Sequence, residues 1–103
     1  MEKSLTTNEL AVLAASGQEL TVLDVRRKED FDKDPQCLAH AQWKDPTEID
    51  QWLPSIAADR EVVIYCMRGG LVSQSVQQRL AESGLKARYV EGGLEAMKLA
   101  DQG

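Results

Sequence analysis

The sequence has few of the residues that build disulfide frameworks or metal centres. Its 103 residues include two cysteines, Cys37 and Cys66, and a single histidine, His40. Two thiols can form neither a disulfide framework nor a four-thiolate zinc site. We therefore expect a reducing, cytoplasmic compartment in which Cys66 stays a free thiol.

Long apolar runs and an excess of positive charge are also missing. No run approaches the length that spans a membrane, and the first residues lead into polar sequence without the apolar core of a signal peptide. The net charge is −5, with acids and bases interspersed. This pattern argues against non-specific nucleic-acid binding and against docking on an anionic membrane, so neither partner is expected. Without repeats or linker-like segments, residues 1–103 are expected to form a single domain.

The sequence does contain short apolar strands that alternate with helical patterns. Strands are predicted at residues 20–24, 41–43, 61–65 and 87–90. Helices are predicted at residues 6–16, 72–83 and 94–100, with shorter helical segments within 27–35 and after residue 45. Such alternation with short connections predicts an α/β fold, a three-layer α/β/α sandwich around a mostly parallel central sheet.

Local signals support several of these boundaries. Thr6 and Glu9 fit a capping box at the start of the first helix. Asp45 followed by Pro46 is typical of a helix start. Gly84 fits the residue that ends the helix over residues 72–83 in a left-handed conformation.

Cys66 is the most informative residue of the sequence. It directly follows the predicted strand over residues 61–65, and a turn with Gly69 and Gly70 separates it from the next helix. Ligands of parallel α/β sheets bind beyond the carboxyl ends of the strands, where Cys66 lies. The two glycines allow positive φ angles and a close approach to a bound group, while backbone N–H groups and the helix N-terminus attract an anion. This setting favours the thiolate, which is the reactive form of cysteine.

We interpret this loop as the site of a nucleophilic cysteine, with Cys66 as its catalytic residue. Arg68 adds a cationic fork suited to oxyanions. The alternative, a buried structural cysteine beside an ordinary turn, does not account for the glycine pair, the arginine and the helix together. The residues predicted to bind the substrate are Met67, Arg68, Gly69, Gly70, Leu71 and Val72.

Three segments in this order resemble the signatures of the rhodanese-like sulfurtransferase family. Residues 22–26 with Phe31 are similar to its "L-D-V-R … E-F" motif, residues 62–66 to its strand into the active cysteine, and residues 89–93 with Ala96 to its closing "L-x-G-G … A-W" motif. The pattern of tryptophans, with residues 72–74, is also similar to a rhodanese subset associated with chromate resistance. The resemblance covers nearly the whole chain.

This resemblance implies a persulfide mechanism that needs no metal or organic cofactor. Cys66 would take the outer sulfur of thiosulfate or a similar donor and pass it to cyanide, to a thiol or to a protein acceptor. In the family, the acid and arginine that correspond to Asp24 and Arg26 brace the structure near the active loop, and a structural ion pair is the favoured interpretation here.

The sequence also departs from the family in ways that leave alternatives open. Residues 35–41 replace the usual "G-H-I-P-G-A" stretch, and Met97 replaces the closing tryptophan. A non-catalytic binding module with the same fold is therefore the main alternative. If residues 73–74 opened the helix, the longer loop would resemble arsenate reductases and dual-specificity phosphatases, but Val72 stands where those enzymes carry an arginine.

Three further features are interpreted without a catalytic role. Cys37 could resolve the Cys66 persulfide as a disulfide, but no C-x-x-C spacing supports this. His40 is interpreted as a surface or structural residue. The charged segment over residues 28–33 is expected to be a solvated face.

Overall fold

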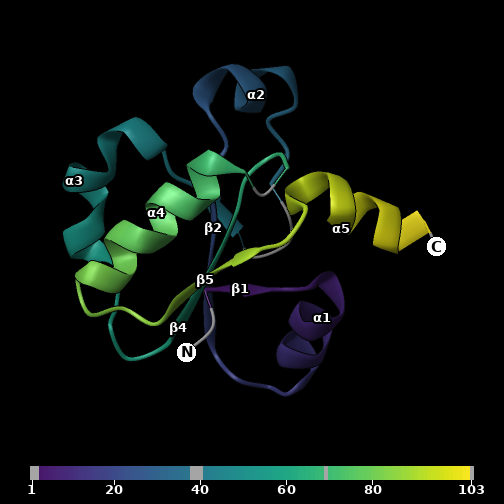
Figure 1. Ribbon diagram of the computed structural model, residues 1–103, viewed down its shortest axis with the longest axis horizontal. Coiled ribbons are helices and arrows are strands. Elements are labelled where there is room, and N and C mark those ends of the chain that lie inside the picture. The colour runs from purple at the N-terminus through teal and green to yellow at the C-terminus, as the bar shows by residue number, and fades with distance from the viewer. Residues whose placement is uncertain (1–2, 38–40, 69, 103) are drawn as a thin grey trace.

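In the computed structural model, which describes residues 3–37, 41–68 and 70–102, five parallel strands form one sheet in the order β1-β5-β4-β2-β3 (Figure 1). The strands are β1 (Ser4–Leu5), β2 (Leu20–Asp24), β3 (Ala41–Trp43), β4 (Glu61–Tyr65) and β5 (Ala87–Val90). The four predicted strands are confirmed. The fifth, β1, was not predicted; it adds an edge beside β5 with Leu5 opposite Val90.

Helices cover both faces of the sheet, so the predicted three-layer α/β/α architecture is confirmed. The chain contains α1 (Thr7–Ala15), α2 (Lys28–Lys33), α3 (Ile49–Trp52), α4 (Leu71–Glu82) and α5 (Gly93–Gln102), with short 3₁₀ turns η1 (Pro46–Glu48) and η2 (Leu53–Ser55). Figure 1 shows α3 and α4 on one side of the sheet and α1 and α5 on the other. No helix among the described residues combines the length and apolar character needed to cross a membrane.

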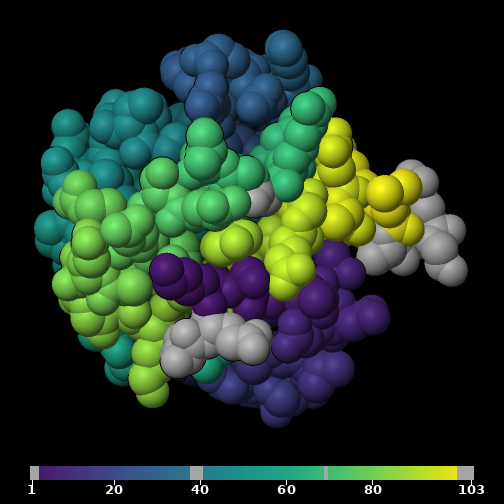
Figure 2. Space-filling view, in the orientation of Figure 1, coloured from purple at the N-terminus to yellow at the C-terminus, as the bar shows by residue number. Residues whose placement is uncertain are grey.

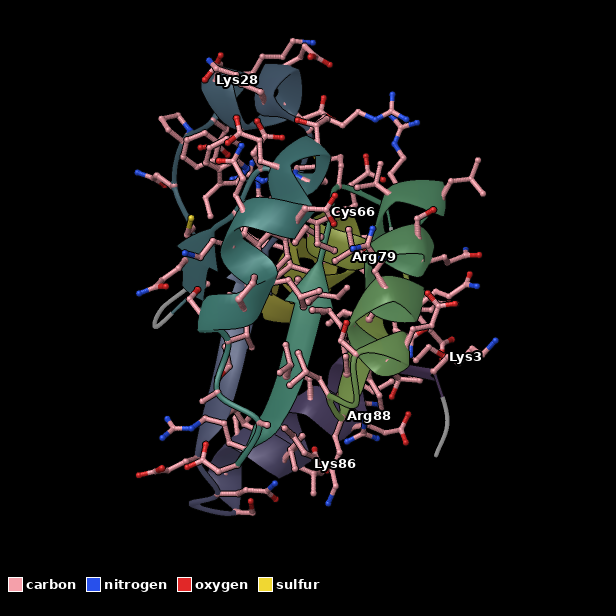
Figure 3. The ribbon with its side chains drawn as sticks, turned by 90° about the vertical axis from the view of Figure 1, so that its left-hand side faces the viewer. Lys3, Lys28, Cys66, Arg79, Lys86 and Arg88 are labelled. Atoms are coloured by element: carbon pink, nitrogen blue, oxygen red, sulfur yellow. The ribbon has the colours of Figure 1, made fainter. Side chains whose placement is uncertain are left out.

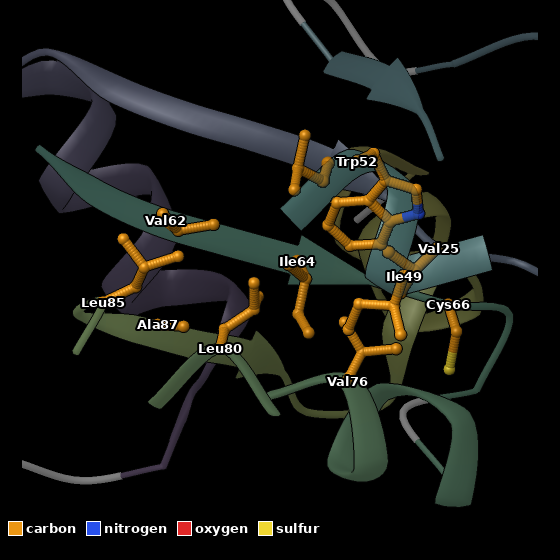
Figure 4. Close-up of a cluster of buried hydrophobic side chains, with 11 residues drawn as sticks. Val25, Ile49, Trp52, Val62, Ile64, Cys66, Val76, Leu80, Leu85 and Ala87 are labelled. Atoms are coloured by element: carbon orange, nitrogen blue, oxygen red, sulfur yellow. The ribbon is translucent and has the colours of Figure 1, made fainter. Parts of the chain in front are cut away.

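The central strand β4 is buried on both faces. Val62 and Ile64 point into the cluster under α3 and α4, whereas Val63 and Tyr65 point into the cluster under α1 and α5. Figure 4 shows the first cluster, where Leu80 of α4 is fully buried. Burying one such side chain contributes about 1.5–3 kcal/mol. This double-sided packing fixes the direction in which the chain leaves β4.

The local signals in the sequence are found at the boundaries of the elements. Glu9 N–H donates to Thr6 Oγ1 at 3.1 Å, and Thr6 N–H donates to Glu9 Oε1 at 2.9 Å. Gly84 has a φ of +87°, as a left-handed helix end requires. Asp45 caps the 3₁₀ turn η1, and the predicted single helix after it is divided into η1, α3 and η2.

Candidate active site

Cys66 lies where the topology brings the carboxyl ends of the central strands together. It follows β4 directly, and the preceding residue Tyr65 is opposite Asp24, the last residue of β2. Figure 3 shows Cys66 at the same end of the sheet as Lys28 of α2, with Lys86 and Arg88 at the opposite end. The position is the one at which parallel α/β sheets bind ligands.

The Cys66 side chain is largely buried but reaches a cavity. It is 6% exposed and packs in the cluster beneath α4. Figure 4 shows its sulfur directed toward the loop that leads into α4. The cavity has a volume of about 650 Å³. It is lined by Cys66 and by five of the residues predicted to bind substrate: Met67, Arg68, Gly70, Leu71 and Val72.

The loop enters α4 without a side-chain cap. The helix begins at Leu71, with Gly70 as its N-cap residue, and no side chain caps it. The first backbone N–H groups of a helix have no acceptor within the helix. Those of α4 therefore stay available to an anion beside Cys66, and the positive end of the helix dipole reinforces this. The longer loop that would place the helix start at Ser73 is not formed.

Gly70 has an ordinary negative φ at the start of α4. Its φ is −86°, so Gly70 does not use the positive φ that a glycine allows. A Cβ at Gly70 would have no atom within 4 Å, because the position faces open space. The lack of a side chain at Gly70 thus leaves room beside the helix N-terminus. Gly69 lies outside the described residues.

The beginning of α5 holds the first residues of the loop in place. Leu94 N–H donates to the Cys66 carbonyl at 2.8 Å, and Glu95 N–H donates to the Met67 carbonyl at 3.1 Å. The turn from β5 into α5 depends on Gly92, whose φ is +76° and where a Cβ would lie 2.6 Å from Ala96 Cβ. Residues far apart in the sequence therefore fix the backbone of Cys66.

Arg68 lies at the rim of the cavity and has a partner there. Its side chain is 78% exposed, and its Nε donates to Glu95 Oε1 at 3.4 Å. Glu95 also lines the cavity. The sequence interpretation did not include Glu95, because α5 approaches the loop only through the sheet order.

Helix α2 and the residue before it contribute three charged residues that the sequence interpretation did not include. Arg27, Asp30 and Lys33 line the Cys66 cavity. Four residues of the segment over residues 28–33 are exposed, as expected for a solvated face, and Asp30 and Lys33 also line the cavity. In Figure 2 the segment after Cys66 lies at the surface between α2, in blue, and the first turns of α5, in yellow. The available signal was the position of α2 directly after β2, whose carboxyl end faces the same site.

Asp24 and Arg26 form a fully buried ion pair on the other face of the sheet. Arg26 Nη2 lies 2.7 Å from Asp24 Oδ2, and both side chains are 0% exposed. Burial disfavours the charge on Arg26, but the hydrogen bond and negative charge of Asp24 outweigh it and raise the pKa of Arg26. Tyr65 Oη donates to Asp24 Oδ2 at 3.2 Å, which ties the pair to the residue before Cys66.

Cys37 belongs to this buried polar cluster and not to the Cys66 cavity. Its Sγ donates to Asp24 Oδ2 at 3.6 Å. Burial raises the pKa of the Cys37 thiol, and the negative charge of Asp24 raises it further. Cys66 points into the cluster on the opposite face, so the two thiols are not brought together. His40 lies outside the described residues.

A second cavity of about 480 Å³ adjoins the first. Arg27, Leu71 and Val72 line both. Within the described part of the chain, no group of three or more histidine, cysteine or acidic side chains is arranged to hold a metal ion.

A cysteine at the end of the central strand of an α/β sandwich, before a helix without a side-chain cap, defines the class of this domain. The model of the Rhodanese-like domain family matches residues 6–100. The chain therefore belongs to the rhodanese-like family.

Comparisons with individual proteins agree with this assignment. A rhodanese-like domain protein from Staphylococcus aureus is 29% identical, with a TM-score of 0.80 over 93% of this chain and 91% of that one. A rhodanese-related protein from Thermoplasma volcanium has the same fold, with a TM-score of 0.80 at 21% identity over 96% and 93% of the two chains.

A curated relative is larger and only partly matched. The tRNA 2-selenouridine synthase of Shewanella sp. (strain ANA-3) is 50% identical over 50 residues, which are 48% of this chain and 14% of that protein. The chain thus corresponds to a small part of that relative.

Proposed function

We propose that this chain is a thiosulfate sulfurtransferase that carries a sulfur atom on Cys66. The Cys66 thiolate attacks the outer sulfur of thiosulfate, a new S–S bond forms, and the bond to the sulfite group breaks with its electron pair leaving on sulfite. The resulting persulfide gives its terminal sulfur to cyanide or to a thiol and regenerates the thiolate. This is covalent catalysis that divides one transfer into two steps.

The observation that carries this proposal is the position of Cys66 in the cavity beside the N-terminus of α4. The first N–H groups of α4, which have no acceptor within the helix, offer hydrogen bonds to the negative charge of the persulfide and of the departing sulfite. Arg68 supplies a cation at the rim. The apolar residues Leu71 and Val72 offer only backbone donors, which is sufficient for this role.

Intact-mass measurement after incubation with thiosulfate tests the proposal. The protein should gain one sulfur atom, which cyanide removes as thiocyanate. Cys66→Ser should gain none, whereas Cys37→Ser should gain it as the unchanged protein does. Absence of the added sulfur with thiosulfate and with an organic persulfide would instead support a non-catalytic binding module. A Cys66→Ser protein that retains sulfur transfer would also contradict the proposal.

The names of the curated relatives favour one second candidate, in which the transferred atom is selenium. Selenosulfate presents selenium where thiosulfate presents its outer sulfur, so attack by Cys66 would again release sulfite and leave selenium on the thiol. Competition between the two donors, read by intact mass, distinguishes the candidates. A strong preference for selenium at equal concentrations would favour this role, and equal or preferred sulfur loading would argue against it.

A further inference from the structure

The cavity around Cys66 carries charges of both signs, contributed by three separate elements. The cations are Arg27, Lys33 and Arg68, and the acids are Asp30 and Glu95. Cations outnumber acids at this site, although the protein has a net charge of −5. The local charge therefore suits an anionic ligand, and the question is which cation is available to bind it.

Arg68 is not fully available, because Glu95 already engages it. The guanidinium Nε lies 3.4 Å from Glu95 Oε1. Glu95 cannot move away freely at its backbone, since its N–H donates to the Met67 carbonyl at 3.1 Å in the loop itself. An anionic donor must therefore compete with the Glu95 carboxylate for Arg68, and that carboxylate also repels the donor.

Arg27 is in the opposite situation. Its side chain is exposed, it lines both cavities, and no ion-pair or hydrogen-bond partner for its guanidinium exists among the described residues. Its backbone is well fixed. Phe31 N–H donates to the Arg27 carbonyl at 2.9 Å, and Trp43 Nε1 donates to the carbonyl of the neighbouring Arg26 at 2.9 Å. Among the residues that the structure describes, Arg27 is thus a cation without a partner, on the side of the cavity formed by α2.

We propose that Arg27 is a further substrate-binding residue of this site, which recognises the anionic part of the sulfur donor, and that Glu95 limits the contribution of Arg68. This inference rests on the proposed sulfur transfer at Cys66 and names its donor class, a compact oxyanion such as thiosulfate. A guanidinium provides a planar fork that matches two oxygens of such a group. Arg27 is a positioning residue for the donor, while the chemistry stays on Cys66.

Calorimetric titration of thiosulfate into the unreactive Cys66→Ser protein tests binding separately from chemistry. Arg27→Gln should weaken thiosulfate binding by about tenfold, which corresponds to about 1.4 kcal/mol, since a unit charge near a dianion is removed. Lys28→Gln is the matched control. Lys28 is the next residue, pairs with Asp32 Oδ2 at 2.8 Å and does not line the Cys66 cavity, so its loss should change the affinity less than twofold.

Glu95→Gln provides a test with the opposite sign. Release of Arg68 and removal of the repelling carboxylate should tighten thiosulfate binding by about threefold. Glu82→Gln, which removes the same charge from the exposed last turn of α4, should leave binding unchanged within twofold. Both effects should shrink at high salt, because the interactions are near the surface.

The outcomes separate this inference from the proposed function. Equal thiosulfate affinity in Arg27→Gln and Lys28→Gln would overturn the role of Arg27, and unchanged affinity in Glu95→Gln would overturn the role of Glu95. In sulfur transfer by the otherwise unchanged protein, Arg27→Gln should raise the KM for thiosulfate with little change in kcat; a loss confined to kcat would contradict a binding role. If thiosulfate binds in an Arg27-dependent way and yet Cys66 gains no sulfur, the proposed function fails and the anion site stands.

Discussion

Replacement of Arg26 by methionine should cost this protein a large part of its stability. The guanidinium makes two hydrogen bonds through Nε to the carboxylate of Asp24, at 3.0 and 2.9 Å, and a third through Nη2 to the Gln36 carbonyl at 3.1 Å. It also lies 5.4 Å from the centre of the Phe31 ring. Arg26→Met would remove these interactions and leave the fully buried Asp24 without its cation.

Loss of one partner from a buried ion pair costs about 3–5 kcal/mol. Asp24 would keep three donors, namely the backbone N–H of residue 26 at 3.0 Å, Tyr65 Oη at 3.2 Å and Cys37 Sγ at 3.6 Å. We therefore expect the lower end of this range, about 3 kcal/mol. For a domain of this size, that loss lowers the Tm by about 12–24 °C.

Urea unfolding followed by circular dichroism at neutral pH measures the change in the free energy of unfolding. The exposed pair of Arg79 and Asp50 supplies the control: Arg79→Met should lose no more than about 1 kcal/mol. Combining Asp24→Asn with Arg26→Met should recover part of the loss, because the unpaired buried charge is then gone. A loss in Arg26→Met no larger than in Arg79→Met would refute the reasoning, as would a double variant less stable than Arg26→Met.

Three further predictions follow from single contacts. Because burial and Asp24 raise its pKa, Cys37 is protonated over a wider pH range in the folded state than in the unfolded state. In the Cys66→Ser protein, alkylation of Cys37 by iodoacetamide should therefore be slower than alkylation of a free cysteine and should accelerate as pH rises. A rate equal to that of free cysteine would contradict this prediction. Gly92→Ala should cost at least about 1–2 kcal/mol in urea unfolding, since φ is +76° and the new Cβ would lie 2.6 Å from Ala96 Cβ; an unchanged midpoint would contradict the strain. Thr6→Ala should cost about 1 kcal/mol in the same assay through loss of the capping box, whereas Thr7→Ala, inside the helix and without that bond, should cost less.

Most of the fold could be predicted because its signals are local. The apolar runs at β2 and β4 lie between polar turns, and the helix ends carry capping residues such as Thr6 and Gly84 that act on their immediate neighbours. The edge strand β1 was missed for the opposite reason. It has two residues, Ser4 and Leu5, and it exists only through its pairing with β5, more than eighty positions along the chain.

In the candidate site, too, local signals could be predicted and long-range contacts could not. Cys66 and its loop could be identified because strand, turn and helix follow one another directly in the sequence. Arg27 and Glu95 could not be identified in this way, since α2 and α5 reach the cavity through the crossover connections and the strand order. The sequence signal around Arg27 is an ordinary run of mixed charges, which in most helices faces water. These charged residues line the cavity because β2, which precedes them, pairs with β4, which precedes Cys66.

Under the proposed function, the same arrangement leaves Cys66 open to a sulfur donor from the side of the cavity. Three hydrogen bonds hold the chain around Cys66: Val25 N–H donates to the Tyr65 carbonyl at 2.8 Å, Tyr65 Oη donates to buried Asp24, and Leu94 N–H donates to the Cys66 carbonyl at 2.8 Å. Two of these contacts use the carbonyls of Tyr65 and Cys66, which lead into the loop. The first N–H groups of α4 have no acceptor within the helix. Under the proposed function, N–H donors held in place by such contacts would stabilise charge as it develops on the nucleophile or the leaving group. Under the proposed function, the buried ion pair of Asp24 and Arg26 would act on Cys66 through the backbone of β4. Variants of this pair that still fold should therefore lose sulfur-transfer rate more than donor affinity.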